Sequence, residues 1–346
     1  QSIIGISMAS IAFTLPTSFF FQATLAFFWL IAFSSATHDI AADGFYMIAL
    51  DEHQQTLNVG VRSTFYRLAT IFGEGLLLML IGLLEVYTRK PVVAWSCGFG
   101  AVAALFLLIA LYHHWILPRP TEDRSISQEK VTFKEGIQQF VETFITFIRK
   151  PRAIIAITFL LLYRVPEALL VKITPLFLSE VESKGGLALT TSELGLVKGT
   201  IGVIGITLGG IIGGIVVAKD GLKRWLWPMV MAMSLPNIFY IFLAYYQPEG
   251  LLWVNLAVGI EQFGYGFGFT LYMLFMLYFS QGASKTAHYA LCTGFMALSM
   301  IIPGSIAGLL SDLLGYYQSF ILVMLLVPIS FYVAYLIRIP DNFGKK

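Results

Sequence analysis

Long apolar stretches alternate with short polar segments along most of the chain. Stretches near the roughly 20 residues that cross a bilayer as a helix lie at 18–50, 60–84, 92–116, 152–180, 192–218, 225–246, 250–281, 287–310 and 315–338, with a partial one at 1–14. This pattern predicts an all-α polytopic membrane protein with about ten spans.

One polar stretch, 117–152, is much longer than the others, and it divides the spans into four before it and six after it. Its basic residues are Arg119, Arg124, Lys130, Lys134, Arg149, Lys150 and Arg152. Between Val131 and Ile148, apolar residues recur at near-helical spacing with polar residues opposite, which is typical of an amphipathic helix on a membrane surface. We expect three parts: an N-terminal helical bundle at 1–116, a cytoplasmic linker at 117–151 and a C-terminal six-helix bundle at 152–346.

Basic residues also indicate the orientation, because Lys and Arg concentrate in cytoplasmic loops. Threading the chain with the linker, Lys219, Lys285 and Arg338 on the cytoplasmic side is consistent along the sequence, and it makes the C-terminus cytoplasmic. The pair Arg89–Lys90 is the exception, since it falls on the outer side.

Composition agrees with this class. Hydrophobic residues make up 57% of the chain and charged residues 12%, and the mean hydropathy is +0.78, whereas a soluble domain carries roughly 25% charged residues. The net charge of +2 gives no indication of nucleic-acid binding. Cys97 and Cys292 both lie in apolar stretches, where they suit packing rather than a disulfide.

The span 18–50 contains three polar residues that could act chemically, His38, Asp39 and Asp43. His38 is a candidate substrate contact. A carboxylate at membrane depth is disfavoured by about 2.5–3.5 kcal/mol or more, so it usually faces a hydrated path and marks function. The two acids are four residues apart and therefore share a helix face. Asp39 has no obvious basic partner at its own level, which makes it a candidate for proton coupling; Asp43 is another.

Asp43 and Arg67 lie at similar distances from the turn between their helices. A pair between them would offset part of the cost of burying each charge. The pair either locks the two helices together or belongs to a substrate path, and the residues leave both open. Glu74, deeper on about the same face as Arg67, is a weaker proton-coupling candidate.

In the span 152–180, Arg164 and Glu167 are neighbours on one helix face, and Pro166 removes a backbone hydrogen bond there. An interrupted transmembrane helix often lines a cavity. We expect Glu167 to couple protons and Arg164 to bind substrate, although the two could also simply neutralise each other at a kink. Lys172 could bind an anion or extend to the outer interface.

Four later residues complete the set: Lys198, Glu261, Gln262 and Tyr265. Lys198 precedes a ladder of glycines at 205, 209 and 213, which favours close helix packing. Glu261 is a further proton-coupling candidate, and its span repeats the acid-bearing pattern of Asp39. Gln262 and Tyr265 are candidate substrate contacts, because amide and aromatic side chains suit sugars and peptides.

Two other classes remain open on the residues alone. His38 with Asp39 and Asp43 could ligate a divalent metal in a membrane-embedded enzyme, although no further ligand elements are visible nearby. A sensor that binds cargo without transporting it is the third class. We expect neither a metal nor a cofactor, and no enzyme.

Several strings are similar to the AmpG-type permeases, a branch of the major facilitator superfamily that also includes acetyl-CoA transporters. They are Ser35-Ala-Thr-His-Asp-Ile-Ala-Ala-Asp43, Tyr163-Arg-Val-Pro-Glu167, Leu194-Gly-Leu-Val-Lys-Gly199, Glu261-Gln-Phe263 and Thr286-Ala-His-Tyr-Ala-Leu291. The resemblance runs over nearly the whole chain and begins at the family's third helix. It implies that two helices precede Gln1, completing six helices, a linker and six more.

The resemblance implies proton-driven import of anhydro-muropeptides across a bacterial inner membrane by a monomer, with protons, a small-molecule substrate and the lipid bilayer as its partners. Another anionic amphiphile, such as an acyl-CoA or a peptide, is the alternative cargo. The carboxylates of such molecules suit Arg164, Lys172 and Lys198. The superfamily's Gly-x-x-x-Asp-Arg-x-Gly signature is altered, since Ala218 stands where its Asp is expected.

Overall fold

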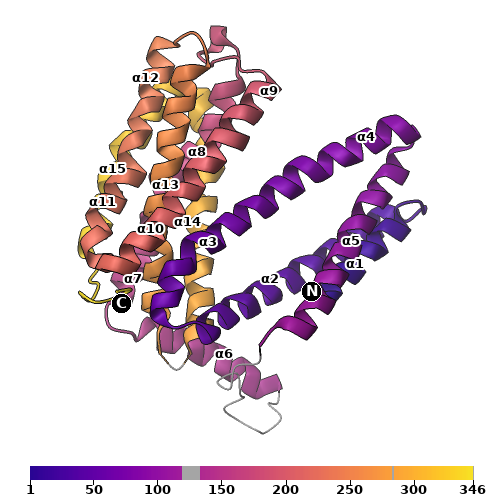
Figure 1. Ribbon diagram of the computed structural model, residues 1–346, viewed down its shortest axis with the longest axis horizontal. Coiled ribbons are helices and arrows are strands. Elements are labelled where there is room, and N and C mark those ends of the chain that lie inside the picture. Colours follow the sequence, from indigo (N-terminus) through magenta and orange to yellow (C-terminus); the bar gives the residue numbers. More distant parts are fainter. Residues whose placement is uncertain (119–132, 283, 346) are drawn as a thin grey trace. The chain divides into compact units, whose positions relative to one another are not determined.

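The computed structural model describes residues 1–118, 133–282 and 284–345, and the chain is almost entirely helical within them (Figure 1). Two compact units emerge: residues 1–49 with 66–128, and residues 50–65 with 129–346. The three-part division with boundaries at 116 and 151 stays a prediction.

The first unit holds the early helices of the chain. They are α1 (Ser2–Thr14), α2 (Phe20–Ala49), the end of α3 (Glu52–Ile71), the π-helix η1 (Phe72–Leu77), α4 (Leu78–Thr88) and α5 (Pro91–Ile116). Helix α1 packs against α2 and α5, and α4 packs against α5. Along α2, large apolar side chains such as Phe21, Trp29 and Phe33 are exposed, which suits a helix whose solvent is lipid.

The second unit contains the start of α3 and the remaining elements. They are α6 (Phe133–Ile148), α7 (Ala153–Leu162), α8 (Val165–Ser179), η2 (Glu182–Lys184), α9 (Thr191–Leu194), η3 (Gly195–Gly202), α10 (Val203–Asp220), α11 (Leu222–Ser234), η4 (Leu235–Asn237), α12 (Ile238–Tyr246), α13 (Leu251–Ser280), α14 (Lys285–Leu314) and α15 (Tyr316–Leu336). Helix α13 is its centre, since it packs against α10, α11 and α14.

Eight helical stretches in the described residues are long and apolar enough to span a membrane, which confirms a multi-pass membrane protein. They match the predicted spans closely, including 250–281, which is observed as Leu251–Ser280. The predicted span 60–84 lies inside the continuous helical stretch α3, η1 and α4, which is not among the eight. The total of ten spans stays a prediction.

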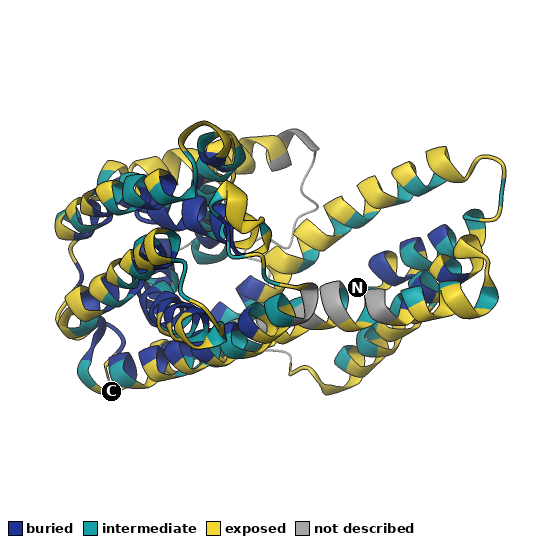
Figure 2. Ribbon diagram, turned by 90° about the horizontal axis from the view of Figure 1, so that it is seen from above, coloured by how far each residue is buried: buried dark blue, intermediate teal, exposed yellow. Residues whose placement is uncertain are grey.

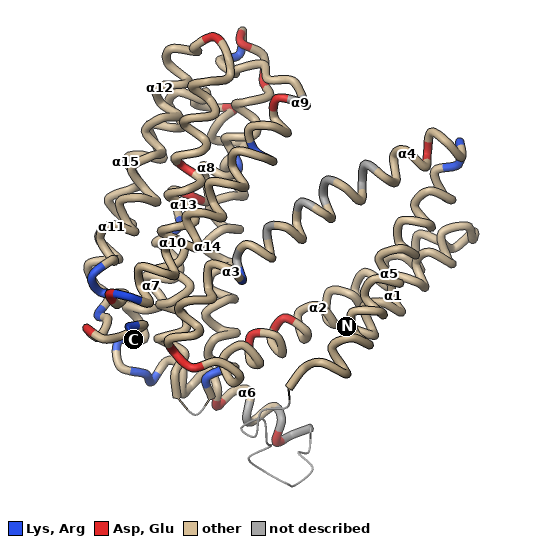
Figure 3. The backbone as a smooth tube through the Cα atoms, viewed as in Figure 1, with Lys and Arg blue, Asp and Glu red and all other residues tan. Residues whose placement is uncertain are grey.

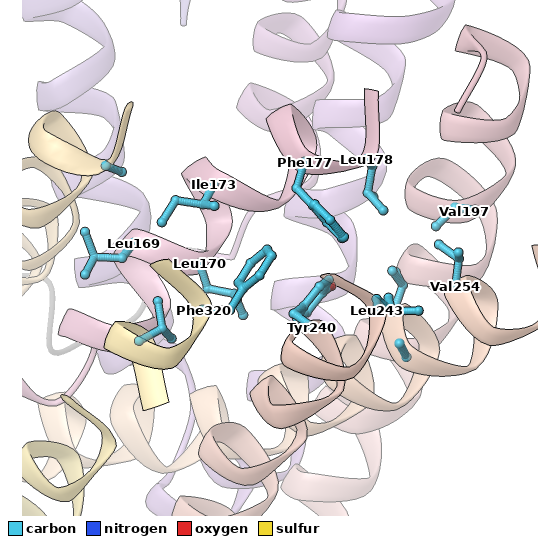
Figure 4. Packing of buried hydrophobic residues seen from close by; sticks show 14 residues of the cluster. Leu169, Leu170, Ile173, Phe177, Leu178, Val197, Tyr240, Leu243, Val254 and Phe320 are labelled. Carbon is cyan, nitrogen blue, oxygen red and sulfur yellow. The ribbon is translucent and has the colours of Figure 1, made fainter. Parts of the chain in front are cut away.

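A cluster of buried side chains holds the second unit together at one level (Figure 4). Phe177 of α8 packs edge-on against Phe320 of α15, with ring centroids 5.0 Å apart. Tyr240 of α12 stacks on the same ring at 5.3 Å. Each such aromatic pair contributes about 0.5–1.5 kcal/mol beyond the burial of its area, so this cluster fixes α8, α12 and α15 to one another.

Helix α6 has the amphipathic character that the sequence predicts. Ile137, Phe140 and Ile148 are exposed, which suits a helix resting on a membrane surface. Phe147, near the C-terminal end of the helix, is buried, and it packs against Phe279 of α13 with ring centroids 5.3 Å apart. The end of α6 is therefore anchored to the second unit.

Glycines set the distance between α10 and α13. A β-carbon at Gly209 would lie 2.1 Å from the carbonyl oxygen of Phe263, and one at Gly205 would lie 2.7 Å from that of Gly259. Both distances are far inside van der Waals contact, so only glycine permits this approach. The close packing expected from the glycine ladder is confirmed, and buried residues fill the interior of this unit (Figure 2).

We predict that Gly209→Ala lowers the stability of the full-length protein by about 1–3 kcal/mol, because the added methyl group forces α10 away from α13. The measurement is thermal unfolding of the purified protein in detergent. Gly308→Ala on α14 is the control: nothing lies within 4 Å of its β-carbon, and alanine is the better helix former. Equal melting temperatures for the two variants would contradict the predicted clash.

Candidate functional site

The candidate site is built around an interruption between helices α7 and α8. Helix α7 ends at Leu162, α8 begins at Val165, and Arg164 caps α8 with φ −101° and ψ 8°. Pro166 sits in the first turn of α8, where its missing N–H removes no helical hydrogen bond. The break predicted at Pro166 is thus observed, two residues before the proline.

Side-chain hydroxyl groups donate hydrogen bonds to the backbone carbonyl groups at this break. The Tyr272 hydroxyl donates a hydrogen bond to the Leu160 carbonyl, and the Ser330 hydroxyl donates one to the Tyr163 carbonyl at 2.7 Å. Backbone polar groups inside a bilayer must be satisfied internally. Helices α13 and α15 therefore hold the break in place.

Arg164 is buried, with 4% of its surface exposed, and it lies among aromatic rings of α13. Its Nη2 donates a hydrogen bond of 2.6 Å to the Tyr265 hydroxyl. Its guanidinium carbon lies 4.7 Å from the ring centroid of Phe269 and 5.6 Å from that of Tyr272. Cation–π contacts of this kind contribute about 2 kcal/mol when they are desolvated. The buried Nε of Arg164 has no hydrogen-bond partner among the described residues, so one donor remains for a ligand or water.

Glu261 is the second buried charge, with 2% of its surface exposed. The Tyr240 hydroxyl donates to one carboxylate oxygen at 3.0 Å. The side-chain amide of Gln262 lies 3.0 Å from both oxygens. Neutral donors therefore hold this carboxylate from two sides.

Lys198 provides the positive charge near these acids. Its ammonium group interacts electrostatically with Glu261 and, more weakly, with Glu167. Glu167 is buried in the first turn of α8, where the positive end of the helix dipole favours an acid. The structure thus brings Glu167, Lys198 and Glu261 together within the second unit. Figure 3 shows charged segments inside this bundle as well as at its ends.

Lys198 lies in η3, where the helix widens to a π-helix from Gly195 to Gly202. Such widened turns often occur at functional sites. Lys198 is half-buried, as are Gln262 and Phe269. These three side chains thus reach the edge of the cluster, whereas its two acids and Arg164 lie inside.

Lys172 lies apart from this cluster. It is exposed, and its aliphatic stem packs over Gly304 of α14, where a β-carbon would lie 3.5 Å from its Cγ. Whether it binds substrate stays a prediction.

In the first unit, α2 carries the other candidates. Asp43 is buried with 3% of its surface exposed, whereas Asp39, one turn earlier, is exposed. His38 is half-buried and interacts electrostatically with Asp39 and with His113 of α5. The shared helix face of the two acids therefore passes from an exposed to a buried environment within one turn.

The side chains of Arg67 and Glu74 lie outside the described residues, so the Asp43–Arg67 pair and the role of Glu74 stay predictions. Among the residues that the structure describes, no group of three or more His, Cys, Asp or Glu side chains could hold a metal ion.

Two residues of the cluster, Phe269 and Tyr240, were not predicted from the sequence. Phe269 stands four residues after Tyr265 and three before Tyr272, so helical periodicity places all three on one face of α13 and offered a usable signal. Tyr240 gave no such signal, because it is one of 16 tyrosines and its contact with Glu261 depends on how α12 packs against α13.

Comparison with solved structures defines the class. The chain superimposes on the fucose:proton symporter FucP of Escherichia coli, a major facilitator superfamily transporter, with a TM-score of 0.64 over 96% of this chain and 82% of that chain. The sequences are 16% identical, so this likeness concerns the fold alone. The protein has the major facilitator superfamily fold.

Comparison with known sequences shows which transporters the chain is similar to. The chain is 23% identical over 312 residues to a Rickettsia typhi protein bearing the name transporter AmpG 2, covering 89% of this chain and 70% of that protein. It is 23% identical over 309 residues to the anhydromuropeptide permease of Escherichia coli K12, covering 89% of this chain and 58% of the permease. The chain thus spans only part of these relatives. No protein-family model matches it. The names of both relatives describe transporters and not enzymes. This agrees with the resemblance to AmpG-type permeases seen in the sequence and with the expectation that the chain is not an enzyme.

We predict that Arg164 and Phe269 stabilise each other by about 1–2 kcal/mol through their cation–π contact. The test is a double-mutant cycle with Arg164→Gln and Phe269→Leu, in which unfolding by a denaturing detergent is followed by tryptophan fluorescence. Non-additive losses of that size confirm the contact. The control pair is Arg224→Gln with Phe269→Leu, which should be additive, because Arg224 interacts with Asp220 instead. Additive losses in both cycles would contradict the prediction.

Proposed function

We propose that the chain belongs to a secondary transporter that imports anhydro-muropeptides together with protons across a bacterial inner membrane. The observation that carries the proposal is a cluster of charges inside an apolar helical bundle: Arg164, Glu167 and Glu261 are buried and Lys198 is half-buried beside them. Charges at membrane depth usually mark an ion or substrate path. The resemblance to a permease of anhydromuropeptides supports the choice of cargo.

The cargo chemistry matches the residues at the edge of the cluster. Fragments of peptidoglycan carry peptide carboxylates and sugar rings. Lys198 is suited to a carboxylate, and Gln262 to sugar hydroxyls or peptide groups. Phe269 offers an apolar ring on which a sugar face can pack. We also propose Tyr265 and Lys172 as contacts, Tyr265 through its hydrogen bond with Arg164.

In this proposal, proton binding and cargo binding are coupled because Glu261 and a cargo carboxylate compete for Lys198. While Glu261 is ionised, it is the principal counter-charge of Lys198. A proton on Glu261 removes that counter-charge, and the ammonium group can then bind a carboxylate of the cargo. Proton and cargo thus favour each other's binding, as linkage between two sites requires. Symport is the result.

Opposite effects on two transport modes test this scheme in vesicles that contain the full-length protein. Glu261→Gln should keep equilibrium exchange of labelled anhydro-muropeptide near the wild-type rate, because a neutral amide leaves Lys198 available. Accumulation driven by a pH gradient should fall at least tenfold. Lys198→Gln should lose both modes. Glu249→Gln, at an exposed position before α13, is the matched control and should lose neither.

Loss of exchange and accumulation together in Glu261→Gln would contradict a coupling role for Glu261. Wild-type accumulation in that variant would contradict it equally. Accumulation of an acyl-CoA but not of the anhydro-muropeptide would redirect the proposal to the alternative cargo.

Asp39 is one of the proton-coupling candidates of the first unit, and it is exposed on α2. We predict that Asp39→Asn slows uptake by the full-length protein and flattens its dependence on pH, since an amide cannot titrate. The measurement is the initial uptake rate as a function of external pH. An unchanged rate and pH profile would remove Asp39 from coupling.

A further inference from the structure

A second polar site lies at one end of the second unit, away from the buried cluster. It is a cavity of about 400 Å³ where α7 begins and where α13 and α15 have just ended. Three cationic side chains line it: Lys150, Arg152 and Arg338. No acid is among its lining residues, so the cavity concentrates positive charge.

The two arginines are available to a ligand. Arg152 and Arg338 are exposed, and neither side chain has a hydrogen-bond or ion-pair partner among the described residues. By contrast, Lys223 and Arg224 interact with Asp341 and Asp220. A planar guanidinium offers paired donors that match the oxygens of a phosphate group.

Lys150 is fixed in place as the third cation. Its Nζ donates hydrogen bonds of 2.6 Å to the carbonyl of Phe279 and 2.8 Å to that of Gln281. These carbonyls lie at the C-terminal end of α13, where a cation is favourable. Burial lowers the pKa of the Lys150 ammonium, and an anion in the cavity would favour its charged form.

Most of the other lining residues are apolar, and they include Ile155, Phe275, Phe279 and Ile337. Tyr278 and Gln281 are the polar exceptions. A cavity with cations on one part and aliphatic and aromatic side chains on another fits a ligand that is itself amphiphilic. A fully hydrated inorganic ion would leave the apolar part without a partner.

We propose that this cavity binds the phosphate group of an anionic ligand, and that the ligand is a membrane phospholipid. Its position supports the lipid as the source. Helix α6, with its exposed apolar face, ends at Ile148, two residues before Lys150. An amphipathic helix lies at the level of the lipid headgroups. The cavity residue Lys150, two residues after this helix, is therefore expected near the same level. Basic pockets between transmembrane helices are suited to anionic headgroups.

Native mass spectrometry of the full-length protein in detergent, titrated with phosphatidylglycerol or phosphatidylcholine, tests the site. Phosphatidylglycerol should bind more tightly than the zwitterionic lipid. Arg152→Gln and Arg338→Gln should each lower its affinity about fivefold, and the double variant about 25-fold. Arg224→Gln is the matched control: it removes the same charge outside the cavity and should change the affinity less than twofold.

A competition arm with glycerol 3-phosphate identifies the source of the phosphate. Failure of glycerol 3-phosphate to displace the lipid supports a phospholipid ligand, and displacement at similar concentrations assigns the phosphate site to a soluble ester instead. Wild-type lipid affinity in the double variant overturns the proposal, as does equal binding of the two lipids. Arg338→Gln alone keeps the test decisive if the double variant does not fold, because Arg338 is exposed beyond the end of α15.

Discussion

The burial of charge inside an apolar bundle is the constraint on which the second unit depends. A guanidinium that leaves water loses several kcal/mol of hydration that nearby groups must offset. For Arg164, the hydroxyl of Tyr265 and the faces of Phe269 and Tyr272 do so, and all three stand on α13. Helix α13 can lie deep enough in the bundle only because Gly205 and Gly209 let α10 approach it at backbone contact. The packing of glycines and the solvation of Arg164 are therefore parts of one arrangement.

Much of this architecture could be predicted from the sequence, because its causes are local. The length of an apolar stretch sets a span, as Leu251–Ser280 illustrates, and near-helical spacing of apolar residues revealed α6. A proline at 166 indicated the broken helix, because proline is favoured in the first turn of a new helix. The glycine ladder indicated close packing without naming the partner helix, which the structure identifies as α13.

The remainder could not be predicted, because it depends on contacts between distant segments. Nothing in Gly195–Gly202 distinguishes a π-helix from an α-helix, yet this widened turn carries Lys198. Tyr240 reaches Glu261 only through the packing of α12. Asp39 and Asp43 share one face of α2, so the sequence pattern does not distinguish them. Only the packing of the folded chain leaves Asp39 exposed and Asp43 buried.

The surroundings of Glu261 allow its charge to change while its position stays fixed. Tyr240 and Gln262 are neutral, so their hydrogen bonds to the carboxyl group do not require it to be ionised. A hydroxyl is both donor and acceptor; on protonation of Glu261, that of Tyr240 can rotate and accept the new proton's hydrogen bond. Lys198 is different, because its interaction with Glu261 is between charges and weakens when the acid is neutral. In the proposed symport, a proton on Glu261 would therefore act mainly on Lys198, which is half-buried.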